Sequence, residues 1–218
     1  MRAAHRCRPP GSRCQYAKEK PCQPNESRYH DLVRTRLIKD ELTYTGEQLR
    51  SLFALDRFGI AGDSIMAFVG PSDIPIREIV DIDDLKAGRR IQAPKMLHFI
   101  AEHFEADLEK TILRQYLLVD ILKDQLNEKL NRLVIRRQGN DLYDGEYKLT
   151  ITTATASPVS CLFHVGINVI PPDETTAKAK GLNGYNIDPL VLGPEVIDRY
   201  SKEVERIALT RCKVHWVE

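Results

Sequence analysis

Long apolar runs are missing from this chain of 218 residues. A membrane-spanning helix needs about 20 consecutive apolar residues, and no run comes near that length. The first residues also lack the apolar stretch of a secretory signal peptide. We therefore expect a cytoplasmic protein that does not cross a membrane.

Cysteine is scarce, and its five copies are poorly placed for a disulfide framework or a metal site. Cys7, Cys14 and Cys22 lie at spacings unlike those of zinc ligands, which are roughly two to four residues apart. Cys161 stands in an apolar stretch, which is typical of a small buried side chain. We predict no metal site.

An excess of one charge is also missing, because the formal net charge is +1. No global field therefore indicates binding to nucleic acid or to a membrane surface. We recognise no Ser-His-Asp arrangement, Cys-His pair, P-loop or dinucleotide-binding motif. The length and composition fit one soluble α+β domain, and they do not indicate an oligomeric state.

Residues 1–30 differ from the rest of the chain. They hold seven Lys/Arg against two Glu, four prolines and almost no periodic apolar residues. This composition predicts a disordered basic arm, followed by a single domain over residues 31–218. The arm could bind an acidic partner, or it could be an incidental extension ahead of a true start near Val33.

The apolar pattern of residues 31–218 predicts a mainly antiparallel sheet with helices on one face, an α+β fold. A long helix should begin after Asp107, which can cap it. We expect residues 70–73 to end a buried strand because they read Gly-Pro-Ser-Asp. The other expected helices cover residues 47–58, 96–104 and 194–209, and the expected strands cover residues 35–42, 64–69, 133–137, 147–155, 161–170 and 212–217.

Polar residues gather around a predicted hairpin in the second half of the chain. Asn140 and Asp141 are adjacent, and Lys148 follows seven residues after the aspartate, across an Asp144-Gly145 pair. Asp-Gly between two β-prone stretches is a strong hairpin signal. The hairpin would bring the lysine beside the Asn-Asp pair, where it could meet a ligand carboxylate or phosphate. Alternatively, Lys148 is a solvated lysine, and the pair bonds the local backbone in a turn.

The order of these residues resembles the catalytic domain of biotin protein ligases. Those enzymes carry K-W-P-N-D-[IL], a lysine seven residues after the aspartate, and a strand ending in G-x-G-I-N-[VM]. Here residues 137–142 read R-Q-G-N-D-L, Lys148 follows, and residues 164–169 read H-V-G-I-N-V. Lipoate ligases carry a related pattern. The resemblance implies that Lys148 contacts the carboxylate and phosphate of an acyl-adenylate, with Arg137, Asn140, Asp141, His164, Gly166 and Asn168 around the ligand.

Two departures separate the chain from those ligases. Ile151 replaces the glycine of their K-L-x-G segment, and no G-R-G-R-x-G-R loop is present. The retained Asn-Asp-Lys spacing favours an acyl-adenylate-type ligase or acyltransferase that uses ATP or an acyl-adenylate. The missing loop favours a non-catalytic module for ligand sensing or protein contact. In either case a small molecule is the expected partner.

A wider resemblance covers the chain from about Val33 to its end. It is to a small family without an assigned activity, domain of unknown function 366, which implies the fold shared by class II synthetases and biotin/lipoate ligases. The segments that carry this resemblance are residues 49–51, 58–64, 80–85, 139–141, 157–160 and 214–217.

Other polar residues are weaker candidates for the same site. Arg50 could clamp a phosphate or carboxylate, or it could form an ordinary surface ion pair. Asp63 and Ser64 precede a buried strand and could stand at the entrance of a site or cap a turn. His164 shares a strand face with residues 166 and 168, so it could point into the same cavity as Lys148. Asn168 needs a partner if it is buried, because an unpaired buried amide costs about 1–3 kcal/mol.

Overall fold

The structure is a computed structural model and describes residues 32–88, 90–172 and 178–217. The arm predicted for residues 1–30 lies outside the described residues, so the boundary at residue 31 stays a prediction. Within the described residues, no helix is long and apolar enough to span a membrane.

The described residues form eight strands, four α-helices and three short 3-10 segments. The strands are β1 (Arg34–Ile38), β2 (Ser64–Ile74), β3 (Ile91–His103), β4 (Ile135–Gln138), β5 (Asp141–Asp144), β6 (Tyr147–Lys148), β7 (Thr150–Ala156) and β8 (Cys161–Ile170). The helices are α1 (Phe53–Phe58), α2 (Ile82–Ala87), α3 (Leu108–Leu130) and α4 (Pro189–Arg211), with 3-10 turns η2 (Glu47–Leu49), η3 (Ile76–Glu78) and η4 (Leu182–Tyr185).

Five strands make the main sheet, in the order β1-β2-β3-β8-β7. The pair β1-β2 is parallel, and the other pairs are antiparallel. The remaining strands form a small antiparallel sheet, β4-β5-β6. The prediction of an α+β fold with a mainly antiparallel sheet is confirmed.

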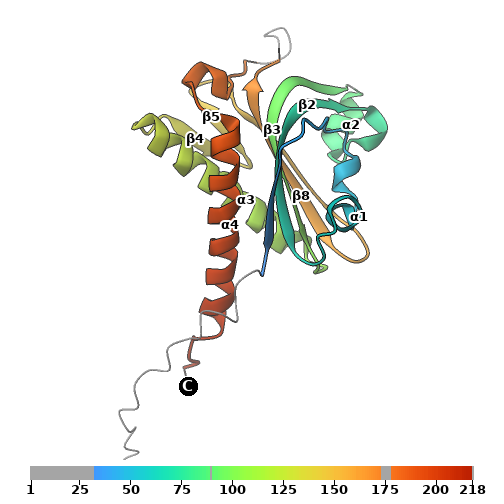
Figure 1. Cartoon of the computed structure of the whole chain (residues 1–218), viewed down its shortest axis with the longest axis vertical. Helices are drawn as coiled ribbons and strands as arrows, with labels where there is room; N and C mark the ends of the chain where they lie inside the picture. Colours follow the sequence, from blue (N-terminus) through green and yellow to red (C-terminus); the bar gives the residue numbers. More distant parts are fainter. Residues whose placement is uncertain (1–31, 89, 173–177, 218) are drawn as a thin grey trace, which may run out of the picture. The chain divides into compact units, whose positions relative to one another are not determined.

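The long helices α3 and α4 cover one face of the main sheet, and the short helices α1 and α2 lie on the other side (Figure 1). The main core lies under the long helices, where Phe99 and Phe163 of the sheet pack with Leu118 and Val196 of the helices. Strand residues of opposite parity, such as Phe68, face the short helices and form a second apolar cluster. The second face carries the histidines described below.

The helix predicted for residues 96–104 is wrong, because these residues form the central strand β3. Both faces of this strand are covered, so its residues from Met96 to His103 are buried without alternation. A continuously buried segment of this kind has no period that distinguishes a buried strand from a buried helix.

The chain also departs from prediction on either side of β2. The helix predicted for residues 47–58 is divided into η2 and α1 by Leu52, which has φ 68°. The buried carboxylate of Glu102 accepts the N–H of Leu52 at 2.8 Å and holds this turn. Residues 70–73 do not end the strand, which continues to Ile74 with a bulge after Gly70. A Cβ on Gly70 would lie 2.1 Å from the carbonyl oxygen of Leu42, so glycine permits this close contact.

Several local predictions are confirmed. Asp107 caps α3 by accepting the N–H of Lys110 at 2.9 Å, and residues 161–170 form β8. The C-terminal helix is longer than predicted because Asp188 caps it ahead of Pro189. The strand predicted for residues 212–217 is wrong, since these residues follow α4 as exposed, irregular chain.

Candidate functional site

The predicted hairpin exists and brings Lys148 to Asp141. Strands β5 and β6 pair antiparallel across Gly145, which adopts φ 58°. The Nζ of Lys148 lies 2.7 Å from Oδ2 of Asp141. The other oxygen of this buried carboxylate accepts a hydrogen bond from Oγ1 of Thr150 at 2.9 Å. The sequence spacing therefore reflects an ion pair within the protein, with the lysine at its exposed side.

Arg137 fixes the turn that precedes this pair. Its guanidinium donates to the carbonyl of Gly139 at 2.6 Å and to Asp120 at 3.1 Å. The same group lies over the ring of Tyr116, 5.0 Å from its centroid. Arg137 thus holds the turn before Asn140 and the ring of Tyr116 in place.

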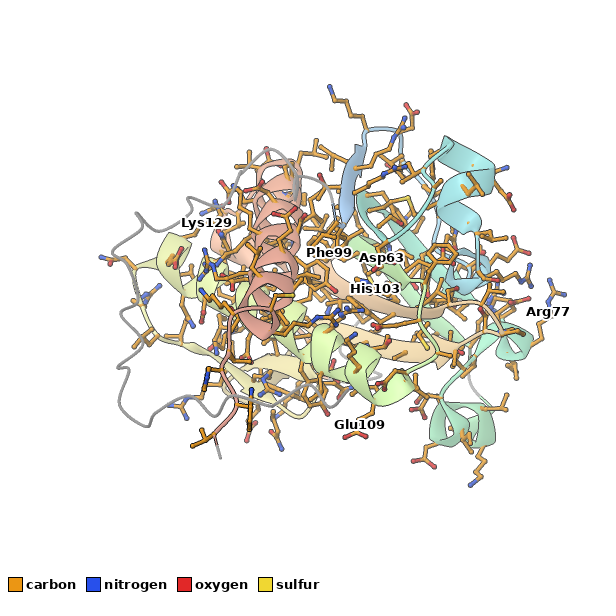
Figure 2. All side chains as sticks on the ribbon, turned by 90° about the horizontal axis from the view of Figure 1, so that it is seen from below. Asp63, Arg77, Phe99, His103, Glu109 and Lys129 are labelled. Carbon is orange, nitrogen blue, oxygen red and sulfur yellow. The ribbon has the colours of Figure 1, made fainter. Side chains whose placement is uncertain are left out.

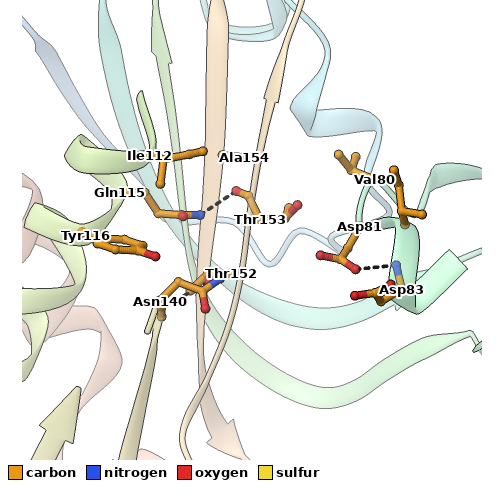
Figure 3. A pocket seen from close by; sticks show the side chains of 11 residues that line it. Val80, Asp81, Asp83, Ile112, Gln115, Tyr116, Asn140, Thr152, Thr153 and Ala154 are labelled. Atoms are coloured by element: carbon orange, nitrogen blue, oxygen red, sulfur yellow. Dashed lines mark hydrogen bonds between the residues drawn. The ribbon is translucent and has the colours of Figure 1, made fainter. Parts of the chain in front are cut away.

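Asn140 and Tyr116 line a cavity of about 410 Å³, which we call the outer pocket (Figure 3). Helix α3 contributes one wall, β7 the floor, and the start of α2 with the two residues before it the opposite wall. The amide of Gln115 is fixed in the wall because it donates to the carbonyls of Thr153 at 2.8 Å and His164 at 3.3 Å. The outer pocket is lined by Val80, Asp81, Ile82, Asp83, Ile112, Gln115, Tyr116, Asn140, Thr152, Thr153 and Ala154.

A smaller cavity of about 30 Å³, the inner pocket, lies next to the outer one. The two share Val80, Asp81, Thr152 and Thr153 as lining residues. The inner pocket is also lined by Tyr44 and by His164 of β8. Its other lining residues are Leu49, Ile74, Glu78, Ile79, Asp84, Ile91 and Ile151.

His164 lines the inner pocket and contacts a second buried histidine, His98, which is not a lining residue. His98 contacts the carbonyl of Gly70 at 3.2 Å through Nε2, and its Nδ1 lies 3.0 Å from Nε2 of His164. Tyr44 stacks on His164 with ring centroids 3.9 Å apart. Burial lowers the pKa of His98 to about 3, and burial together with the charge of His98 lowers the pKa of His164 well below its usual value. Both rings are therefore neutral at pH 7.

Gly166 makes room for this arrangement. A Cβ at this position would lie 3.0 Å from Cε1 of His164 and 3.0 Å from Cε of Met96. The glycine of the G-I-N-V segment thus admits a neighbouring imidazole. Asn168, further along the strand, is 4% exposed and donates to the carbonyl of Lys180 at 3.3 Å. Its Oδ1 accepts no hydrogen bond from the residues that the structure describes.

The two pockets carry negative charge. Glu78, Asp81, Asp83 and Asp84 line one or both of them, and no Lys or Arg of the described residues does. Lys148 is absent from both linings and pairs with Asp141 instead. The electrostatics of the cavities therefore differ from those expected around an acyl-adenylate.

Residues 33–215 match the family described as domain of unknown function (DUF366). The chain belongs to this family. It is 34% identical over 176 residues to an uncharacterized protein of Methanocaldococcus jannaschii, covering 78% of this chain and 79% of that one. A protein of unknown function from Pyrococcus horikoshi superposes with a TM-score of 0.78 at 33% identity, over 85% of this chain and 100% of the other.

More distant structures show the fold of this family member. Biotin protein ligase from Aquifex aeolicus, in complex with biotin and ATP, has a TM-score of 0.57 at 16% identity. The match covers 79% of this chain and 71% of the ligase. Biotin protein ligase from Leishmania major, in complex with biotin, has a TM-score of 0.52 at 14% identity, covering 85% of each chain. The predicted biotin/lipoate-ligase-like fold is confirmed.

Segments of the DUF366 resemblance lie at different places in the fold. Residues 80–85 and 139–141 contribute to the pocket linings. Residues 157–160 contact Glu102 instead, through a 2.7 Å hydrogen bond from Ser160. Tyr44 and Tyr116 line the pockets, but neither lies in a sequence motif that predicts a site. Their only signal is an aromatic ring beside polar neighbours.

Three of the weaker candidates lie away from the pocket linings. Arg50 forms a surface ion pair with Glu78 at 2.9 Å, the alternative that the sequence left open. Asp63 accepts from His103 at 2.8 Å and from the N–H of Phe104 at 2.9 Å (Figure 2). Ser64 is buried at the start of β2. Asp63 and Ser64 therefore have structural roles at the start of β2, outside the pocket linings.

Proposed function

We propose that this domain binds a small molecule that occupies the outer pocket and reaches into the inner one. The observation that carries the proposal is the adjacency of the two pockets, which share four lining residues: Val80, Asp81, Thr152 and Thr153. Ligand sites are concave and combine apolar walls with a few fixed polar groups. Ile112 and Tyr116 supply the apolar wall here.

The polar groups around the outer pocket are held in position before a ligand arrives. Gln115 is bonded to two strand carbonyls, and Arg137 holds the turn that presents Asn140. The hydroxyl of Thr152 donates to the carbonyl of Asn140 at 3.3 Å. Such preorganisation reduces the conformational entropy that the protein loses when a ligand binds. In its simplest form the proposed function is ligand sensing without catalysis.

The test is to fill the outer pocket and measure bound small molecules. Thr152→Trp places a large ring in the outer pocket, whereas Thr155→Trp, on the same strand, lies outside both linings and serves as the matched control. We expect mass spectrometry to detect a small molecule released from the wild type and from Thr155→Trp but not from Thr152→Trp. Equal release from all three proteins would contradict the proposal.

The second candidate function is an acyl-adenylate-type ligase or acyltransferase that binds a small carboxylate or acyl-nucleotide. The observation that favours it is the assembled hairpin, in which Lys148 pairs with Asp141 next to Asn140, a lining residue of the outer pocket. In such chemistry the ammonium of Lys148 would neutralise charge that develops on an acyl or phosphoryl oxygen. ATP or an acyl-adenylate would be the co-substrate.

This candidate is tested by ATP–pyrophosphate exchange in the presence of short carboxylic acids. Lys148→Ala should abolish exchange, while Lys178→Ala should leave it unchanged. Lys178 is an apt control because it is an exposed lysine that pairs with Glu146. Absence of exchange in the wild type would exclude the ligase and leave the binding proposal intact.

A further inference from the structure

The hydrogen bonds of the histidine pair fix the position of every ring proton. The carbonyl of Gly70 can only accept, so Nε2 of His98 carries a proton and donates to it. A neutral imidazole has a single N–H, and Nδ1 of His98 must therefore be an acceptor. It accepts the N–H at Nε2 of His164, 3.0 Å away. The remaining nitrogen of His164, Nδ1, is left with a bare lone pair.

No hydrogen bond from the described part of the chain reaches this nitrogen. His164 is only 2% exposed, yet its Nδ1 is not one of the fully buried side-chain atoms without a partner, so it opens onto the inner pocket. An acceptor in such a position is satisfied by water or by a bound molecule. His164 lines the inner pocket. A group that enters this pocket and carries an N–H would satisfy the acceptor.

The acidic residues around the inner pocket indicate that the group donating to His164 is positively charged. Arg50 neutralises Glu78, with contacts of 2.9 and 3.0 Å to its two oxygens. Asp81 and Asp84 also line the pocket, and no basic side chain of the described lining faces them. Asp81 uses Oδ1 to accept two backbone N–H groups of α2, which leaves Oδ2 available.

We propose that the group that enters the inner pocket is a small cation with N–H donors, an ammonium or amidinium, that donates to Nδ1 of His164 beside Asp81 and Asp84. This inference rests on the proposed binding function and specifies its ligand class. The inner pocket, about 30 Å³, has room for about two groups the size of a water molecule. The apolar body of the ligand would lie in the outer pocket against Ile112 and Tyr116.

The experiment uses three probes of one shape and different charge: benzylamine, benzyl alcohol and benzoate. Their affinities for the full-length protein are measured by titration calorimetry. A hydrogen bond that involves a charged partner is stronger than a neutral one, so benzylamine should bind about tenfold to a hundredfold more tightly than benzyl alcohol. Benzoate should bind most weakly, because the pocket carboxylates repel it.

Nitrogen-15 NMR of the histidine rings gives a direct readout in the wild type. Benzylamine should shift the Nδ1 resonance of His164 from that of a bare nitrogen toward that of a hydrogen-bond acceptor. His103 is the internal control, because both of its ring nitrogens are already bonded, to Asp63 and Tyr200, and its resonances should not move. Asp84→Asn, an exposed change, should weaken benzylamine but not benzyl alcohol.

Two results would overturn the inference while leaving the proposed function standing. One is that benzoate binds the wild type more tightly than benzylamine does, and that Thr152→Trp abolishes the binding of benzoate. The other is binding of benzylamine without any change at Nδ1 of His164. If no probe binds and wild type and Thr152→Trp release the same molecules, both the inference and the proposed function are wrong.

Discussion

The ammonium of Lys148 lies 2.7 Å from the carboxylate of Asp141, and the two residues differ sharply in burial. The side chain of Lys148 is 38% exposed, whereas that of Asp141 is 12% exposed. Asp141 also accepts from the buried hydroxyl of Thr150, which in turn accepts the N–H of Leu142 at 2.8 Å. The aspartate is therefore a member of a buried network, and the lysine lies at its surface.

Because of this difference in burial, removing the side chain of Asp141 should destabilise the protein more than removing that of Lys148. Asp141→Ala leaves the hydroxyl of Thr150 without its acceptor and should lower the free energy of unfolding by about 1–3 kcal/mol. Lys148→Ala removes a half-exposed ion pair and should cost within about 1 kcal/mol. Urea denaturation of both variants measures the difference. A larger loss for Lys148→Ala would show that the lysine is a main structural element of the hairpin.

Asp63 should contribute to acid sensitivity. Burial raises the pKa of this carboxyl, but the hydrogen bonds from His103 and from the N–H of Phe104 outweigh it, so the pKa lies below its usual value. A carboxyl with a lowered folded-state pKa adds stability above its unfolded pKa of about 3.9, and this stability is lost as pH falls through the folded value. Asp63→Asn should therefore destabilise the protein at pH 7, and its deficit should shrink below about pH 4.

The matched control for Asp63 is Asp56→Asn, an exposed change on α1. Its free energy of unfolding should stay within about 0.5 kcal/mol of the wild type at both pH values. Chemical denaturation at pH 7 and pH 3 provides the measurement. An unchanged deficit for Asp63→Asn between these pH values would show that its hydrogen bonds do not depend on ionisation.

The sequence predicts those parts of the fold whose cause is local. Asp144-Gly145 specifies the hairpin because the turn needs a residue with positive φ, and Gly145 has φ 58°. Asp107 specifies the start of α3 because its side chain bonds a nearby backbone N–H. The Asp-to-Lys spacing likewise predicts the contact of Lys148 with Asp141, since both lie on the same hairpin.

The pockets could not be predicted in this way, because distant segments build them. Tyr44 lies between β1 and η2, Tyr116 on α3 and His164 on β8, and only the folded chain brings these segments to the two pockets. Strand β3 is not predictable from its pattern, because burial on both faces removes the alternation of apolar and polar residues. Arg137 lies where the ligase resemblance places a ligand contact, and tertiary packing gives it Asp120 and Tyr116 as neighbours.

Two glycines should be intolerant of alanine, to different degrees. In Gly70→Ala the new Cβ would lie 2.1 Å from the backbone oxygen of Leu42, a residue held in place because its N–H donates to the carbonyl of Val69 in β2. In Gly166→Ala the Cβ would lie 3.0 Å from the flexible end of Met96 and from the ring of His164. We expect the free energy of unfolding to fall by more than about 3 kcal/mol in Gly70→Ala and by about 1–3 kcal/mol in Gly166→Ala.

Thermal denaturation measures both losses. Gly184→Ala is the control, because nothing lies near the Cβ position of Gly184. Equal loss at Gly184 and Gly70 would show that chain entropy, not contact, sets the cost.

The histidine pair should make stability fall between about pH 6 and pH 4. Burial lowers the pKa of His98 from 6.5 to about 3. Below pH 6.5, His98 is therefore protonated in the unfolded chain but stays neutral in the folded protein. Stability therefore falls as pH falls, by up to about 1.4 kcal/mol per pH unit for each such histidine. His98→Gln keeps an amide that can donate to the carbonyl of Gly70 and does not titrate, so it should flatten this slope. His215→Gln, at an exposed histidine, should leave the slope unchanged. Denaturant titrations at half-unit pH steps measure how the free energy of unfolding depends on pH. Equal slopes in wild type and His98→Gln would mean that His98 is protonated in the folded protein.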